Sequence, residues 1–131
     1  RGELVSGYDT YARIAGATLQ RLQIPKDKVI EAAGAMVYRN RTFESAKAVK
    51  AKLHELGIPV RGLNVVSEGP HARRTRLVYQ RVFGRETRVG VLAIASLDYD
   101  TEHWWKSSEG VKATLTEGIA WLFEGLFWSG R

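Results

Sequence analysis

The chain has 131 residues, of which 44% are hydrophobic and 26% charged, values ordinary for one globular domain large enough to bury a core. It contains no cysteine, so disulfides and thiolate metal sites are excluded. The net charge of +6 favours anionic partners but does not separate nucleic acid, phosphorylated metabolites and membrane surfaces. No uninterrupted apolar run approaches the roughly 20 residues that a membrane span needs.

The amino-terminal third predicts a helix followed by a short strand. Apolar residues recur at helical spacing over residues 8–22, and Pro25 ends the pattern because proline cannot continue the backbone hydrogen bonds. Residues 29–32 (Val-Ile-Glu-Ala) predict a strand, and residues 34–41 predict a loop that carries two arginines.

A second helix is expected over residues 42–56, because Gly57 and Pro59 form a carboxyl-terminal stop signal. On a helical wheel its inner face begins with Thr42 and Ser45. Thr42 in that position can be a plain helix N-cap or a ligand contact.

The remaining sequence predicts two strands, each followed by a helix. The first strand covers residues 60–66, and the helix after it ends near Phe83 and Gly84. Residues 87–96 are almost continuously apolar and β-branched, as in a strand buried on both faces. An acidic loop over residues 97–103 leads into a last helix, from Trp104 or Ser108 to Phe127.

Helices and strands of these lengths alternate as α-β-α-β-α-β-α, which predicts an α/β fold. We expect a single domain over residues 1–131, a three-layer Rossmann-like parallel sheet flanked by helices. Three strands make a thin sheet, and the chain starts at Arg1 without a methionine. It is therefore expected to be the carboxyl-terminal portion of a longer chain, with a strand or two before Arg1.

The segment Ser67-Glu68-Gly69-Pro70-His71-Ala72-Arg73-Arg74-Thr75-Arg76 lies where a predicted strand passes into a helix. In open α/β sheets, ligands bind at this carboxyl edge of the strands. A wheel centred on Val78 turns His71 and Arg74 inward, while Arg73 and Arg76 fall on the opposite side and are interpreted as solvent-exposed charge.

A half-buried Arg74 needs an anion beside it, because an unpaired desolvated charge is costly. One alternative is an internal carboxylate, such as Glu68, Asp98 or Asp100. The other is a ligand phosphate or carboxylate, assisted by free amides at the helix start. The residues alone leave both open.

Other polar and aromatic residues are expected at the same edge. Trp104 and Trp105 are interpreted as caps of the core rather than as stacking platforms. The acidic loop offers carboxylates for a divalent ion but lacks the glycine and spacing of an EF-hand, so no metal is predicted. Nucleotide-binding glycine loops and the hydrolase nucleophile elbow are absent from the sequence.

Three blocks resemble the YdcF/SanA/ElyC family of bacterial envelope proteins. They are residues 39–46 (Arg-Asn-Arg-Thr-Phe-Glu-Ser-Ala), residues 65–74 (Val-Val-Ser-Glu-Gly-Pro-His-Ala-Arg-Arg) and residues 104–111 (Trp-Trp-Lys-Ser-Ser-Glu-Gly-Val). The resemblance covers nearly all of the chain and departs at its start. Family members usually begin with an apolar strand and a glycine-rich turn that this sequence lacks, so half of the expected pocket is absent.

Carried over by position, the family's functional Thr, polar residue, His and Arg fall on Thr42, Ser45, His71 and Arg74. In this interpretation Arg74 and Arg41 neutralise an anion, Thr42 and Ser45 donate hydrogen bonds, and His71 is the general acid or base if the protein is an enzyme. The predicted site is thus His71 for catalysis and Arg41, Thr42, Ser45, Glu68 and Arg74 for binding.

The resemblance implies a Rossmann-like protein linked to cell-envelope or peptidoglycan precursor metabolism. Such a protein is expected to bind an anionic small molecule that is phosphorylated, nucleotide-like or lipid-linked. S-adenosylmethionine or another nucleotide-like cofactor is implied for some members. The resemblance also implies the periplasmic side of the bacterial inner membrane, through an anchor before Arg1; the fragment itself is expected to be soluble, and a cytoplasmic location stays open.

A rival interpretation is a non-catalytic binding or scaffold module. The last predicted helix is apolar nearly all round from Ile119 to Trp128 and needs cover on more than one side. Nucleic-acid binding is not favoured, because the arginines between Arg73 and Arg88 do not share one face and no aromatic residues are interleaved for stacking.

Overall fold

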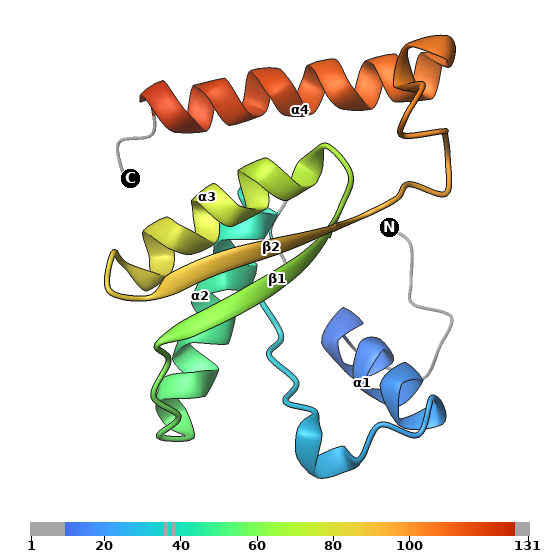
Figure 1. Ribbon diagram of the computed structural model, residues 1–131. Helices are drawn as coiled ribbons and strands as arrows, with labels where there is room; N and C mark the ends of the chain where they lie inside the picture. The colour runs from blue at the N-terminus through green and yellow to red at the C-terminus, as the bar shows by residue number, and fades with distance from the viewer. Residues whose placement is uncertain (1–9, 36, 38, 128–131) are drawn as a thin grey trace. The chain divides into compact units, whose positions relative to one another are not determined.

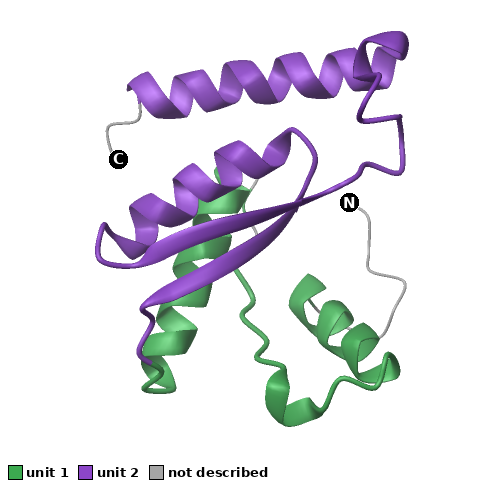
Figure 2. Ribbon diagram, viewed as in Figure 1, with its two compact units in different colours: residues 1–58 green, residues 59–131 purple. Residues whose placement is uncertain are grey.

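The computed structural model describes residues 10–35, 37 and 39–127, which form two compact units, residues 1–58 and 59–131 (Figure 2). Each unit is described by itself. The elements of the first are the helix α1 (Tyr11–Arg21), the short 3₁₀ helix η1 (Lys26–Lys28) and the helix α2 (Arg41–Glu55). Those of the second are β1 (Gly62–Glu68), α3 (His71–Phe83), β2 (Arg88–Ile94), η2 (Trp104–Lys106) and α4 (Ser108–Phe127) (Figure 1).

The helix α1 begins where a side chain can cap it. Thr10 is extended, and its hydroxyl accepts a hydrogen bond from the backbone N–H of Arg13 at 3.3 Å. The sequence predicted a start at Tyr8, which lies outside the described residues. The predicted end at Leu22 is confirmed, because Leu22 is the C-cap.

The strand predicted over residues 29–32 does not form, and this prediction was wrong. The backbone of Val29 is extended, at φ −116° and ψ 119°, but within the described part of the chain no strand pairs with it. An extended segment becomes a strand only when a neighbour supplies the hydrogen bonds. A Cβ added at Gly16 of α1 would collide with the Glu31 carboxyl group, so this segment packs against α1 instead.

The helix α2 starts one residue earlier than predicted and ends at Glu55. Its N-cap is Asn40, in the left-handed conformation at φ 57° and without a side-chain hydrogen bond to the helix. Thr42 is therefore already helical, and its interpretation as an N-cap was wrong. Ala46 is fully buried, but Ser45 and Leu56 are exposed, so only part of the predicted inner face is covered.

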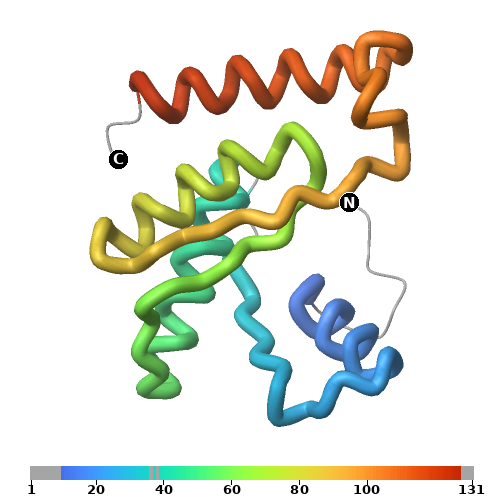
Figure 3. The backbone as a smooth tube through the Cα atoms, viewed as in Figure 1, coloured from blue at the N-terminus to red at the C-terminus, as the bar shows by residue number. Residues whose placement is uncertain are grey.

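The second unit is a β-α-β-α arrangement around a two-stranded parallel sheet, and it confirms the α/β class (Figure 3). β1 and β2 pair in register from Gly62↔Arg88 to Glu68↔Ile94. Both strands contact α3, which crosses from one to the other and packs on the sheet. The predicted strands at 60–66 and 87–96 are thus confirmed with shifted ends.

The core of this unit lies between α3 and the sheet. Its buried residues are Ala72, Thr75, Val78, Phe83, Thr87 and Val89. The strand predicted over residues 87–96, which is β2, was expected to be buried on both faces, and this prediction was wrong. Leu92 and Ile94 are 58% and 54% exposed, and Val66 of β1 is 60% exposed, because α3 covers only one face of the strands.

Two ion pairs join α3 to α4. Arg74 pairs with Glu117, and Arg81 pairs with Glu124 through its carboxylate and its backbone carbonyl. From the first pair to the second, the arginine and the glutamate each lie seven residues further along the chain. The two helices therefore run in the same direction, as Figure 1 shows. Seven residues correspond to two helical turns, or about 10 Å of helix.

The amino end of α4 is closed by a contact that only glycine permits. The backbone N–H of Gly110 donates to the Ser107 hydroxyl at 3.0 Å, and Gly110 is buried. A Cβ added there would meet the carbonyl oxygen of Trp104 in η2 and the Ser107 hydroxyl well inside contact distance. The turn η2 can therefore lie directly against the first turn of the helix.

The same substitution should have opposite effects at two positions of α4. Gly110→Ala should lower the free energy of unfolding by about 1–3 kcal/mol, because backbone atoms must move to admit the methyl group. Gly118→Ala should raise it by up to about 1 kcal/mol, because a Cβ there meets nothing within 4 Å and alanine favours the helix. Urea unfolding of both variants tests this; destabilisation of equal size would contradict it.

Candidate functional site at the carboxyl ends of the strands

β1 and α3 are joined by a tight turn at the carboxyl edge of the sheet. The backbone N–H of Gly69 donates to the carbonyl of Ile94 at 2.8 Å, which continues the ladder by one bond beyond Glu68. Gly69 has φ +33°, and a Cβ placed there would lie 3.5 Å from the Tyr99 hydroxyl. The turn brings the first residues of α3 to the strand ends, where the sequence predicted a site.

Arg74 forms a two-pronged ion pair with Glu117 of α4. Its Nε donates to Oε2 of Glu117 at 2.8 Å, and its Nη2 donates to Oε1 at 3.2 Å. Each side chain is 21% exposed. Of the two alternatives for Arg74, the internal carboxylate is the one present, although the sequence named Glu68, Asp98 and Asp100 as candidates and not Glu117.

His71 joins this pair through one nitrogen. Its Nδ1 lies 3.0 Å from Oε2 of Glu117 and 2.8 Å from Nη2 of Arg74. A protonated Nδ1 donates to Glu117, whereas an unprotonated Nδ1 accepts from Arg74, so the tautomer decides which partner it holds. We call His71, Arg74 and Glu117 the Glu117 cluster.

The cluster keeps Glu117 ionised. Burial alone would raise the pKa of its carboxyl group, but hydrogen bonds from Arg74 and His71 and their charges outweigh burial. The pKa of Glu117 therefore lies below its ordinary value of 4.5. An ionised carboxylate is an acceptor only, with more lone-pair positions than the cluster uses.

A pair of hydroxyl groups holds α3 onto the end of β1 behind the cluster. The Thr75 hydroxyl donates to the carbonyl of His71 at 3.0 Å. Since that uses its only hydrogen, the contact of 3.2 Å between the hydroxyls of Ser67 and Thr75 has Ser67 as the donor. Thr75 is buried, so the bonds fix the first turn of α3, where His71 and Arg74 lie.

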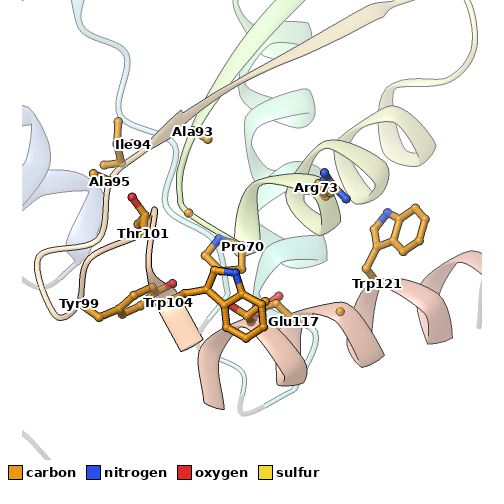
Figure 4. A pocket seen from close by; sticks show the side chains of 13 residues that line it. Pro70, Arg73, Ala93, Ile94, Ala95, Tyr99, Thr101, Trp104, Glu117 and Trp121 are labelled. Atoms are coloured by element: carbon orange, nitrogen blue, oxygen red, sulfur yellow. The ribbon is translucent and has the colours of Figure 1, made fainter. Parts of the chain in front are cut away.

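A cavity of about 620 Å³ opens beside the cluster, at the carboxyl ends of β1 and β2 (Figure 4). The turn before α3, the end of β2, the loop after it and α4 all contribute to its wall. Its lining residues include Arg73, Tyr99, Trp104, Glu117 and Trp121. In the view of Figure 4, Trp104 and Glu117 lie between Tyr99 on one side and Arg73 with Trp121 on the other.

Arg73 is exposed, as the wheel predicted, yet it also lines this cavity. Its interpretation as plain solvent-facing charge is therefore incomplete. Arg76 is exposed in the second turn of α3, where its Nε donates to the carbonyl of Val89 at 3.0 Å. Trp104 lines the cavity, whereas its neighbour Trp105 is 57% exposed and packs edge-on against it.

Tyr99 closes the cavity on the side of the loop. Its hydroxyl and that of Thr114 are both enclosed, and neither makes a hydrogen bond of full geometry with a described protein atom. Burial, followed by the charge of Glu68, raises the pKa of Tyr99, although the nearby Thr114 hydroxyl acts in the opposite direction. Tyr99 is thus a neutral phenol that brings the loop against α4.

The remaining acidic residues of this edge make local contacts. Glu68 accepts a hydrogen bond from the Ser96 hydroxyl, and Ser96 in turn accepts from the backbone N–H of Asp98. Asp100 pairs with His103 at 2.8 Å, and this hydrogen bond lowers the pKa of Asp100. Over the described residues, no three His, Cys, Asp or Glu side chains gather as metal ligands would.

The predicted site residues divide between the two units. Glu68, His71 and Arg74 lie together at the edge of the sheet, and none of the three lines the cavity. Arg41, Thr42 and Ser45 lie in the first two turns of α2, in the other unit. The pairing of those three with the sheet edge stays a prediction.

Sequence reasoning missed the contribution of α4, namely Thr114, Glu117 and Trp121. One signal was present: after the first turn, which has Glu109, the acidic residues of α4 are Glu117 and Glu124, and their spacing of seven matches that of Arg74 and Arg81. No known protein family, curated protein sequence or solved structure matches the chain.

The lowered pKa of Glu117 gives a pH dependence of definite sign. Such a carboxyl group adds stability above its unfolded pKa and loses it as the pH falls through the folded pKa. Glu117→Gln should therefore lower the free energy of unfolding at pH 7 by about 1–2 kcal/mol and flatten its decline below about pH 5. Urea unfolding at pH 7, 5, 4 and 3 measures both effects.

Arg74→Gln is the matching variant, because it removes the strongest contribution that lowers the pKa of Glu117. It should flatten the acid limb as well. An acid limb as steep as that of the wild type in both variants would contradict the assignment.

Proposed function

We propose that this chain binds an anionic small molecule, phosphorylated, nucleotide-like or lipid-linked, in the cavity at the carboxyl ends of β1 and β2. The observation that carries the proposal is the cavity itself, with Arg73 in its wall beside the first turn of α3. Parallel strands place ligands at this edge, and a helix amino terminus favours negative charge.

The charges around the cavity support an anion. Arg73 and Arg74 are positive and Glu117 is negative, so these three groups together carry one positive charge. Glu117 repels an anion weakly, because the guanidinium group of Arg74 neutralises it at 2.8 Å. Arg74 thus supports anion binding through Glu117, and Arg73 is the residue placed to touch the anion.

The shape of the wall favours a ligand with an apolar portion. Trp104 and Trp121 present aromatic surface, and Pro70 and Ile94 add aliphatic surface. Small-molecule pockets combine such surface with a few polar groups that fix orientation. An inorganic anion would use Arg73 alone, whereas an organic phosphate would use both kinds of surface.

The finer identity is part of the same proposal. A Rossmann-like domain of the YdcF/SanA/ElyC type, placed at the bacterial cell envelope and acting on a precursor or lipid carrier, fits the three sequence blocks and the position of the cavity. If the protein is an enzyme, His71 is its general acid or base in this proposal. Among the described helices, none has both the length and the apolar character of a membrane span.

Arg73→Gln should weaken the binding of organic phosphates by about tenfold, because one charge-assisted contact is lost. Titration calorimetry with adenosine monophosphate and inorganic phosphate measures the change. Arg85→Gln is the matched control: it removes the same charge from an exposed position after α3 and should bind as the wild type does. Equal weakening in both variants would indicate general charge attraction instead of a site.

A second candidate function is a non-catalytic binding module that acts through α4. One stripe of this helix, Leu115, Ile119, Leu122 and Leu126, is 51–73% exposed, at spacings of four, three and four residues. That spacing is typical of a helix that packs along a second helix. The stripe is distinct from the contacts that Glu117 and Glu124 make with α3.

If α4 is such a surface, sedimentation velocity should show assembly that grows with protein concentration. Ile119→Glu should abolish it, since burying a charge in an apolar seam is costly. Ser108→Glu, at an exposed position at the start of the same helix, should leave it unchanged. A wild-type protein that stays monomeric at every concentration, with the helical circular dichroism intact, would remove the main support for this function.

A further inference from the structure

Glu117 is the one described acidic residue that lines the cavity, and the Glu117 cluster leaves part of it unused. Oε2 receives Arg74 Nε at 2.8 Å and has His71 Nδ1 at 3.0 Å, whereas Oε1 receives only Arg74 Nη2, at 3.2 Å. A carboxylate oxygen has two lone-pair positions. Oε1 therefore keeps a lone-pair position for a second donor, and Glu117 lines the cavity from which a ligand would supply that donor.

The kind of donor follows from the charge. Glu117 stays ionised and accepts hydrogen bonds only, but Arg74 already balances its charge. A cationic ligand group would gain little from this balanced pair and would be repelled by Arg73. A neutral hydroxyl group is not repelled by Arg73, and it gains a charge-assisted hydrogen bond to Glu117.

The neighbouring residues add two more constraints. Trp104 lies beside Glu117 in the wall, and its flat face can cover one side of a ring (Figure 4). Arg73 lines the same cavity and carries the charge that an anion needs. A ligand that satisfies all three residues is a ring with hydroxyl groups and a phosphate attached.

We propose that Glu117 is a specificity-determining residue of this cavity, and that it selects sugar phosphates, alone or within a nucleotide, over anions that lack a hydroxyl-bearing ring. The inference rests on the proposed function, because it requires anion binding in the same cavity. It adds the class of ligand and the residue that recognises it.

The structure offers a matched control for the test. Glu117→Gln removes the ion pair to α3 and replaces the charged cavity acceptor with a neutral amide, which accepts only weaker hydrogen bonds. Glu124→Gln removes the charge from the equivalent pair two turns along α4, with Arg81, and Glu124 does not line the cavity. Both variants weaken a contact between α3 and α4, and a change in ligand choice that only Glu117→Gln shows belongs to Glu117.

The experiment is titration calorimetry with inorganic phosphate, ribose 5-phosphate, 2-deoxyribose 5-phosphate and adenosine monophosphate. The wild type should bind ribose 5-phosphate at least about tenfold more tightly than inorganic phosphate, as one charge-assisted hydrogen bond allows. Glu117→Gln should reduce this preference to within about threefold. Glu124→Gln should keep it.

The remaining arms locate the hydroxyl and the base. If the wild type binds 2-deoxyribose 5-phosphate no more tightly than inorganic phosphate, the proposal is supported and the contact with Glu117 is assigned to the 2-hydroxyl. Tighter binding of adenosine monophosphate than of ribose 5-phosphate, with the dependence on Glu117 kept, would support the nucleotide form.

Two results would overturn the inference alone: equal affinity of the wild type for phosphate and ribose 5-phosphate, or a preference that Glu117→Gln leaves intact. If Glu117→Gln does not fold, equal affinity of the wild type for phosphate and ribose 5-phosphate would still overturn the inference. Absence of binding by every ligand in the panel would overturn the proposed function itself, and the inference with it.

Discussion

The structure of the second unit depends on the way α4 is held against α3. Two arginines of α3 reach two glutamates of α4, and both pairs advance by seven residues. A single pair would leave α4 free to pivot about one point, whereas two pairs about 10 Å apart fix both its direction and its register. The cavity depends on this register, because two of its lining residues belong to this part of α4. Glu117 is itself one of the two anchoring residues, and Trp121 lies between it and Glu124.

The sequence predicted much of the fold correctly where periodicity and stop signals were strong. α2 with its Gly57 stop, α3 and the two paired strands follow directly from the pattern. The strand predicted over residues 29–32 was wrong, because a strand forms only beside a neighbouring strand, and the described residues supply none there. The types of four residues alone cannot reveal whether such a neighbour exists. The sequence prediction was also wrong about burial of Leu92 and Ile94, since burial depends on how many layers cover a sheet.

The candidate site was predictable in position but not in composition. A strand followed by Gly69, Pro70 and a helix indicates the carboxyl edge of a sheet, and that edge has the cavity. The wheel separated Arg74 from Arg73 correctly by burial. It could not show that α4 supplies Glu117 to Arg74, because the matched spacing of seven indicates a contact across 43 residues only once the packing of the two helices is known.

The two arginines of this edge therefore have different roles, and burial decides between them. Arg74 is sufficiently desolvated to require a carboxylate beside it. The carboxylate of Glu117 balances the charge of Arg74, and the ion pair orients Glu117. Arg73 is exposed beside the cavity and keeps its charge for an incoming anion. A ligand consequently meets the free charge of Arg73 and the oriented acceptor of Glu117. Buried arginine positions the acceptor while exposed arginine attracts the anion, and this division requires both residues to be adjacent in the first turn of α3.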